Sequence, residues 1–317
     1  MSGPSLLLLR ARNAESTLPG GFSSHETYPP FHCGHACRMF RTMTERKPFD
    51  FDADGKPTGL SDEFAPHLGL LAPRPVAFLS FGDAASLGNR RSKLGGAAHL
   101  PSGHEAPVGD ARPLGLFAQI DFAEMPALPD FPADGVLQVW VDPDDEMFGH
   151  DEDSAAEQKN FKVLYFSADQ ELAPSGDDVV PAGMPLSAVH SISFSAEQDL
   201  PGVAMIGELQ PSGRWQRSFA AFDDGDLGCR LEDEVFALHD RTGNENAPKI
   251  GGYPCFFNGH PGERSSAAYA FDRLLLQLPS HHGSTVSIWG SGTANFMITR
   301  DDLLARDFSN VWYWLDH

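Results

Sequence analysis

The chain has 317 residues, 41% of them hydrophobic, which is typical of a soluble protein with one large core or two ordinary domains. Its 23 basic and 44 acidic residues give a net charge of −21, which disfavours nucleic acid and anionic membranes as partners. Because no apolar run approaches the roughly 20 residues of a membrane span and the four cysteines are scattered, we expect a cytoplasmic protein with free thiols.

Residues 1–48 differ in composition from the rest of the chain. They are rich in Gly, Pro, Ser and His and lack apolar periodicity, so they predict either a disordered segment or a mis-called extension that precedes a true start at Met39 or Met43. The string His-Cys-Gly-His-Ala-Cys at residues 32–37 holds metal-ligand side chains. A zinc site needs a second, distant pair of ligands, which is absent, so we expect no metal there.

The ordered region begins with a calcium-like string. Asp50, Asp52 and Asp54 precede Gly55 as in the first half of a calcium loop, but Ser61 stands where the closing Glu belongs. The string therefore favours a polar Asp-Gly turn over a calcium site.

The remaining elements are mostly short strands. Leu231, Val235 and Leu238 predict one helical face over residues 231–238, and Thr299 begins a string that resembles a capping box, which predicts a short helix there. The aromatic residues of 308–314 predict a C-terminus packed into the core. Strands are predicted at residues 76–81, 162–166 and 189–194.

Three strings recur in the same order about half a chain length later, which predicts two copies of one β-rich unit related by a pseudo-twofold axis. Both copies of the middle string carry a glutamine, Gln119 and Gln277, opposite an apolar face. The two amides either satisfy loop backbone or line a polar groove between the copies. The paired strings are residues 93–96 with 249–252, 116–120 with 274–278, and 135–141 with 292–298.

The faces of the middle strings follow from strict alternation. Leu116, Ala118 and Ile120 are expected on one face of the first copy, and Leu274, Leu276 and Leu278 on one face of the second.

The Lys-[Leu/Ile]-Gly-Gly strings at residues 93–96 and 249–252 admit two interpretations. In the first, the paired glycines form a tight turn and the lysine is exposed or snorkels. In the second, the glycine amides and the lysine bind an anion. Neither a phosphate-binding G-x-x-x-x-G-K-[ST] loop nor a dinucleotide fingerprint occurs, so no cofactor is expected.

Signatures of catalysis are also missing. The chain has no G-x-S-x-G or H-E-x-x-H string. His281 and His282 are expected in a loop, either as a solvated pair or as a general base or metal ligand. The question of enzymatic activity therefore stays open.

Several uncommon strings occur in order: KLGG at 93–96, LP at 100–101, LFAQID at 116–121, GVLQ at 135–138, KIGGYP at 249–254, LLLQ at 274–277, WG at 289–290 and DFSNVW at 307–312. Together they make residues 70–317 resemble the bacterial YwqG-like family. The resemblance implies an α+β, strand-rich fold with few short helices and assigns no activity. We expect one domain over residues 49–317, with repeats at about 70–160 and 245–317 joined by a variable middle segment.

Two classes of function follow. The first is a cytoplasmic binding protein, regulatory or immunity-like, whose acidic surface attracts a basic protein partner. The second is an enzyme or a small-molecule-binding protein with a site between the repeats. The candidate ligand-binding residues are Lys93, Gly95, Gly96, Gln119, Asp121, Lys249, Gly251, Gly252, Gln277 and Trp289.

Overall fold

The fold is known from a computed structural model that describes residues 46–87, 91–110, 112–206, 225–280 and 285–316, all within one unit, Phe40–His317. The expectations for residues 1–45, including the string at 32–37, and for His281 and His282 lie outside the described residues.

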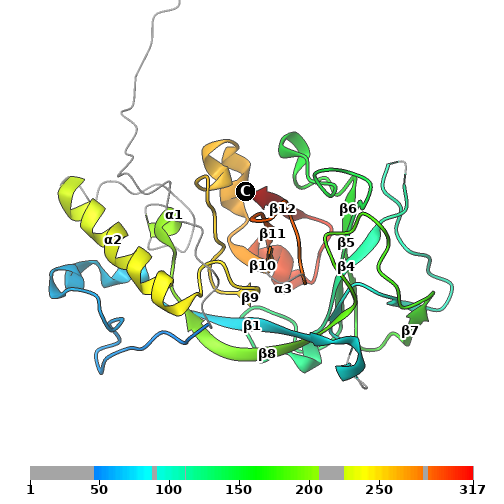
Figure 1. Ribbon diagram of the computed structural model, residues 1–317, viewed down its shortest axis with the longest axis horizontal. Coiled ribbons are helices and arrows are strands. Elements are labelled where there is room, and N and C mark those ends of the chain that lie inside the picture. Colours follow the sequence, from blue (N-terminus) through cyan, green and yellow to red (C-terminus); the bar gives the residue numbers. More distant parts are fainter. Residues whose placement is uncertain (1–45, 88–90, 111, 207–224, 281–284, 317) are drawn as a thin grey trace, which may run out of the picture. The chain divides into compact units, whose positions relative to one another are not determined.

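Strands dominate the described chain (Figure 1). They are β1 (Arg74–Asp83), β2 (Lys93–Leu94), β3 (Ala98–Pro101), β4 (Gly115–Asp121), β5 (Val136–Val141), β6 (Phe161–Phe166), β7 (Leu172–Ser175), β8 (His190–Asp199), β9 (Lys249–Gly251), β10 (Arg273–Pro279), β11 (Thr293–Ile298) and β12 (Val311–Asp316). The α-helices are α1 (Val203–Ile206), α2 (Gly225–Thr242) and α3 (Arg300–Ala305). Short 3-10 helices are η1 (Asp62–Leu71), η2 (Ala84–Ser86), η3 (Phe122–Glu124), η4 (Glu152–Ser154), η6 (Pro261–Glu263) and η7 (Ser266–Ala270).

A 10-stranded antiparallel sheet is built outward from one central pair of strands. β1 and β8 pair along their whole length, from Arg74 opposite Asp199 to Asp83 opposite His190. Beyond β8 follow β2, β4, β5 and β6, and beyond β1 follow β9, β10, β11 and β12. β3 and β7 form a separate two-stranded sheet. The strand-rich fold with few helices predicted from the sequence is therefore confirmed.

The sheet curves until its edge strands β6 and β12 approach each other. The rings of Phe161 and Tyr313 lie 5.1 Å apart, and Tyr313 N donates to Ala155 O over 2.9 Å. Gln158 Nε2 donates to Phe308 O over 2.8 Å. Strands from both sides of the central pair therefore share one apolar core on the concave face.

Both middle strings carry a β-bulge that the sequence did not reveal. The register shifts between Leu116 and Ala118 in β4, and between Leu274 and Leu276 in β10. Leu116 consequently packs with Trp140, whereas Ala118 and Ile120 face the concave core. The prediction that Leu116 and Leu274 share a face with the alternate residues after them is wrong, because a bulge inserts one residue into the alternation.

The other sequence-predicted elements are confirmed. The predicted strands correspond to β1, β6 and β8, and α2 buries Leu231, Val235 and Leu238 but extends over 18 residues. The C-terminal strand β12 is buried throughout. None of the helices in the described part of the chain combines the length and hydropathy needed to cross a bilayer.

Candidate functional site

The first Lys-Gly-Gly string forms a small cradle for a carboxylate, and Asp178 fills it. Lys93 Nζ donates to Asp178 Oδ1 over 3.0 Å, and Ala97 N donates to the same oxygen over 2.9 Å. The Lys93 side chain is 5% exposed, whereas that of Asp178 is 51% exposed. Burial opposes ionisation of Asp178, but the bonds from Ala97 and Lys93 outweigh it and lower the pKa of Asp178.

We call Lys93 Nζ, Ala97 N–H and the Gly96 backbone the Lys93 cradle. Gly96 has a φ of 75°, and a Cβ there would lie 2.1 Å from Asp178 Oδ1. The positive φ favours glycine, and a larger residue would also have to displace the Asp178 carboxylate.

The second string forms a matching cradle with Asp199. Lys249 Nζ donates to Asp199 Oδ2 over 2.9 Å, and Tyr253 N donates to the same oxygen over 3.0 Å. A Cβ on Gly252 would lie 2.6 Å from Asp199 Oδ2. Asp199 belongs to the central strand β8 and is completely buried, unlike Asp178.

Both lysines are buried, so the prediction of an exposed or snorkelling lysine is wrong. Lys93 and Lys249 point into the protein because each meets a carboxylate that neutralises it. The predicted turns themselves are present, since all four glycines of the two strings have a positive φ.

The two glutamines bind loop backbone. Gln119 Oε1 accepts from His99 N over 2.8 Å, and its Nε2 donates to Arg91 O over 2.8 Å. Gln277 Oε1 accepts from Cys255 N over 2.8 Å, and its Nε2 donates to Ala247 O over 2.9 Å. Of the two roles predicted for these amides, bonding to loop backbone or lining a polar groove, the geometry corresponds to the first.

Their strand neighbours complete the same pattern. Gln138 Nε2 donates to His99 O over 2.7 Å, and Asn295 Nδ2 donates to Cys255 O over 3.0 Å. Gln119 Nε2 also lies 2.6 Å from His99 Nδ1. Burial, followed by the charges of Lys93 and Arg91, lowers the pKa of His99, so its ring favours the neutral form.

Asp121 anchors the end of β4. Its Oδ2 accepts from Arg91 Nε over 2.8 Å, and its Oδ1 caps the short helix η3 by accepting from Ala123 N. The corresponding position in the second string is Pro279, which has no acidic group.

Trp289 lies in the loop between β10 and β11. It is 41% exposed with a φ of 45°, and its ring lies 6.1 Å from that of Phe148, whose φ is 52°. Aromatic residues rarely adopt a positive φ, so both loops hold strained backbone at this point.

The structure groups the candidate residues around two separate points. Lys93, Gly95, Gly96, Gln119 and Asp121 surround β2 and β4, whereas Lys249, Gly251, Gly252 and Gln277 surround β9 and β10. The strands β1 and β8 lie between the two groups. The geometry therefore offers two small sites on one sheet.

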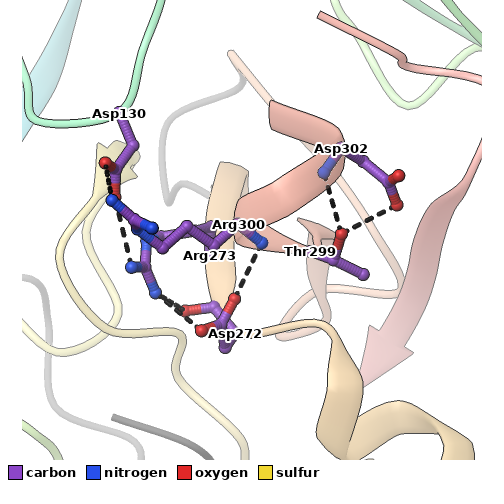
Figure 2. A network of polar contacts seen from close by, with 6 residues as sticks. All are labelled: Asp130, Asp272, Arg273, Thr299, Arg300 and Asp302. Atoms are coloured by element: carbon purple, nitrogen blue, oxygen red, sulfur yellow. Dashed lines mark hydrogen bonds and ion pairs between the residues drawn. The ribbon is translucent and has the colours of Figure 1, made fainter. Parts of the chain in front are cut away.

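A polar network joins the two sides of the sheet (Figure 2). Asp130, in the loop between β4 and β5, accepts hydrogen bonds from Arg273 of β10 and Arg300 of α3. Asp272 accepts from both arginines as well. Burial opposes ionisation of Asp130, but the bonds from Arg300 and Arg273 lower its pKa.

The calcium-like string forms the polar turn expected from the sequence. Asp52 Oδ1 accepts from Asp54 N and Lys56 N, and Gly55 has a φ of 80°. In the described part of the chain, no group of three or more His, Cys, Asp or Glu side chains is placed to hold a metal ion.

Sequence reasoning missed the two carboxylates that complete the cradles. Asp178 and Asp199 lie far along the chain from Lys93 and Lys249, and 44 acidic residues give no reason to select either one. His99 could have been selected from the sequence, because its spacing from Lys93 equals the spacing of Cys255 from Lys249.

The comparisons with known proteins identify a family whose match covers every strand of the sheet except β1. A domain of unknown function, DUF1963, matches residues 92–316. The chain belongs to this family, since the match covers more than half of its length. A search of curated proteins found no match.

Proposed function

We propose that this chain is a non-enzymatic, cytoplasmic binding protein, regulatory or immunity-like, whose acidic surface binds a basic protein partner. We further propose that it is a bacterial YwqG-like member of its family, and that its sheet arose by duplication of one β-rich unit.

The observation that carries the binding role is the internal use of the candidate polar groups. Each buried lysine is neutralised by an aspartate, and each buried glutamine is bonded to loop backbone. Groups held in this way are not free to act on a substrate between the two sides of the sheet. The charge of −21 supports a basic partner, because opposite charge accelerates encounter.

The loop between β5 and β6 is the surface that we propose for this contact. It carries exposed acidic residues on one connected segment, which favours attraction of a basic surface. Its exposed acidic residues are Asp144, Glu146, Asp151, Glu152, Asp153 and Glu157.

The duplication is supported by matched contacts. The strand order reads β2, β4, β5, β6 on one side of the central pair and β9, β10, β11, β12 on the other. The bulges in β4 and β10 fall at matching positions, as do the amide contacts of Gln119 and Gln277. Superposing the two sides in an experimental structure tests this proposal, and strands that fail to overlay about a twofold axis contradict it.

Affinity capture from the native host tests the binding role. Asp144→Asn, Glu146→Gln and Asp153→Asn together remove three of the six exposed acidic charges of the loop and spare the carboxylates that form side-chain hydrogen bonds. They should strongly weaken capture of a basic protein that rising salt also releases. The control combines Asp54→Asn, Glu105→Gln and Glu171→Gln, which remove equal charge at other exposed positions. Equal capture by both variants, or capture that salt does not weaken, contradicts the proposal.

A second candidate is a small-molecule site at one cradle. The specific observation in its favour is the half-exposed Asp178 above the buried Lys93.

A further inference from the structure

The two cradles hold the same ion pair in different surroundings. Asp199 is part of β8 and cannot leave Lys249 without breaking the central strand pair. Asp178 lies in residues 176–183, which are exposed except for the half-buried Val180. We call residues 176–183 the plug segment.

Few backbone hydrogen bonds attach the plug segment, and its packing contacts are those of Val180 with the apolar core and of Gly183 beside Pro143 O. Among the described residues, its backbone hydrogen bonds run within the segment or to Met184, as in Val179 N to Asp177 O. The contacts near the cradle are the Asp178 carboxylate and Val180 Cγ2, which lies 2.9 Å from the Cβ position of Gly95. Segments with few buried contacts and few backbone bonds open locally at low free energy.

Opening the plug segment would leave the Lys93 ammonium without its counter-ion. In the described chain Asp178 is the acceptor for the Lys93 ammonium, and the lysine side chain is 5% exposed. The open cradle then presents two donors, Lys93 Nζ and Ala97 N–H, that are already placed for one carboxylate oxygen. The Ala97 N–H and the Gly96 turn stay in place because β2 and β4 hold them.

We propose that the Lys93 cradle binds a small carboxylic acid with a short apolar chain, which enters in exchange for the Asp178 side chain. The ligand carboxylate accepts from Lys93 Nζ and Ala97 N, as Asp178 does. Its chain contacts the apolar side chains of Leu186 and Val189, which flank Gly95 and Gly96. The Asp199 side is permanently closed by its own strand. This inference rests on the second candidate function, a small-molecule site at one cradle, and names the ligand class of that site.

Chemical rescue of Asp178→Ala tests the proposal on the purified full chain. Removing Asp178 should lower the melting temperature, and acetate or butyrate should restore it more than chloride at equal ionic strength, because a ligand that binds the folded state stabilises it. We expect about a tenfold weaker effect of butyrate on the wild-type chain, where Asp178 competes. Adding Lys93→Met to Asp178→Ala should abolish the rescue.

The matched control is Asp177→Ala, which removes the same charge from the adjacent exposed position. Rescue of both variants by carboxylates, or equal rescue of Asp178→Ala by chloride or inorganic phosphate, overturns the proposal.

Hydrogen exchange of the wild-type chain decides the case if Asp178→Ala does not fold. The Ala97 N–H should exchange at least about tenfold faster than the Tyr253 N–H, and butyrate should slow it. Equally slow exchange at both amides overturns the proposal. Because neither measurement involves a protein partner, failure here is distinguishable from failure of partner capture.

Discussion

Lys249 and Asp199 form an ion pair of 2.9 Å with side chains that are 1% and 0% exposed. This buried pair links β9 to β8 across β1. Removing one partner leaves the other charge buried and unpaired, which destabilises the protein more than the loss of a surface pair does.

Replacing Lys249 should strongly destabilise the protein. Lys249→Met leaves the Asp199 carboxylate buried without its cation, and we expect a loss of about 3–5 kcal/mol in the free energy of unfolding. Urea denaturation measures this loss. Lys159→Met is the control, because Lys159 and Glu157 are 49% and 57% exposed, and it should change stability by less than about 1 kcal/mol. Similar losses for the two variants contradict the prediction.

The second cradle should reject a methyl group at Gly252. Gly252→Ala places a Cβ 2.6 Å from Asp199 Oδ2 and requires a φ of 66° for alanine. Gly55→Ala is the matched variant, because it has a φ of 80° but no atom within 4 Å of the added Cβ. We expect Gly252→Ala to lose about 1–3 kcal/mol more than Gly55→Ala in urea denaturation, since overpacking adds to the backbone strain. Equal losses of stability in the two variants would contradict the prediction, because they would mean that the contact between the added Cβ and Asp199 is relieved.

Asp130 should make the stability of the folded protein depend on pH in the acid range. Its folded pKa is lowered, so its stabilisation is fully present above the unfolded value of about 3.9 and is lost as pH falls through the folded pKa. The stability difference between wild type and Asp130→Asn should therefore be largest near neutral pH and shrink below about pH 4. Asp134→Asn, an exposed change in the same loop, is the control variant. Thermal unfolding across this pH range measures both.

His150 should produce a second acid transition at higher pH. Its ring lies 5.5 Å from that of Tyr313 and 5.3 Å from that of Trp314, and neither ring nitrogen has a hydrogen-bond partner in the described chain. Burial, partly opposed by Asp151 and Asp145, lowers the pKa of His150 to about 4.

The unfolded chain, with a His pKa of about 6.5, binds protons more readily between these two values, so stability falls as pH drops from about 6.5 to about 4. His150→Leu should flatten this part of the profile without a large loss at neutral pH. An unchanged slope in urea denaturation between these values would exclude the role of His150. Burial also lowers the pKa of His260 to about 4, so His260→Leu is the variant with which His150→Leu is compared.

Removing the last strand should unfold the protein. A chain that ends at Asn310 lacks Trp312, Tyr313 and Trp314, which are at most 5% exposed and line two apolar clusters. We expect loss of the cooperative thermal transition, measured by circular dichroism, because the truncation removes three large side chains from these clusters at once. Leu304→Ala, at a position 50% exposed, should leave the transition nearly unchanged.

The recurring strings predicted much of the sheet, because apolar alternation and turn glycines are local signals. Thr299 illustrates this, since its hydroxyl caps α3 by accepting from Asp302 N (Figure 2). The bulge at Leu116 was not predictable, because it depends on how β4 pairs with β5. The burial of Lys93 was equally hidden, since its counter-ion Asp178 comes from a distant segment.

The hydrogen bond from Tyr313 N to Ala155 O also bears on how copies of the protein behave toward one another. Tyr313 lies on an outermost strand, where an unoccupied N–H is a template for a strand from another molecule. Ala155 O, in the loop before β6, already accepts the hydrogen bond from Tyr313 N. Edge-to-edge pairing of β12 with a strand of another molecule is therefore obstructed at Tyr313. The near-closure of the sheet thus limits strand pairing with another molecule at this edge as well as enclosing the core.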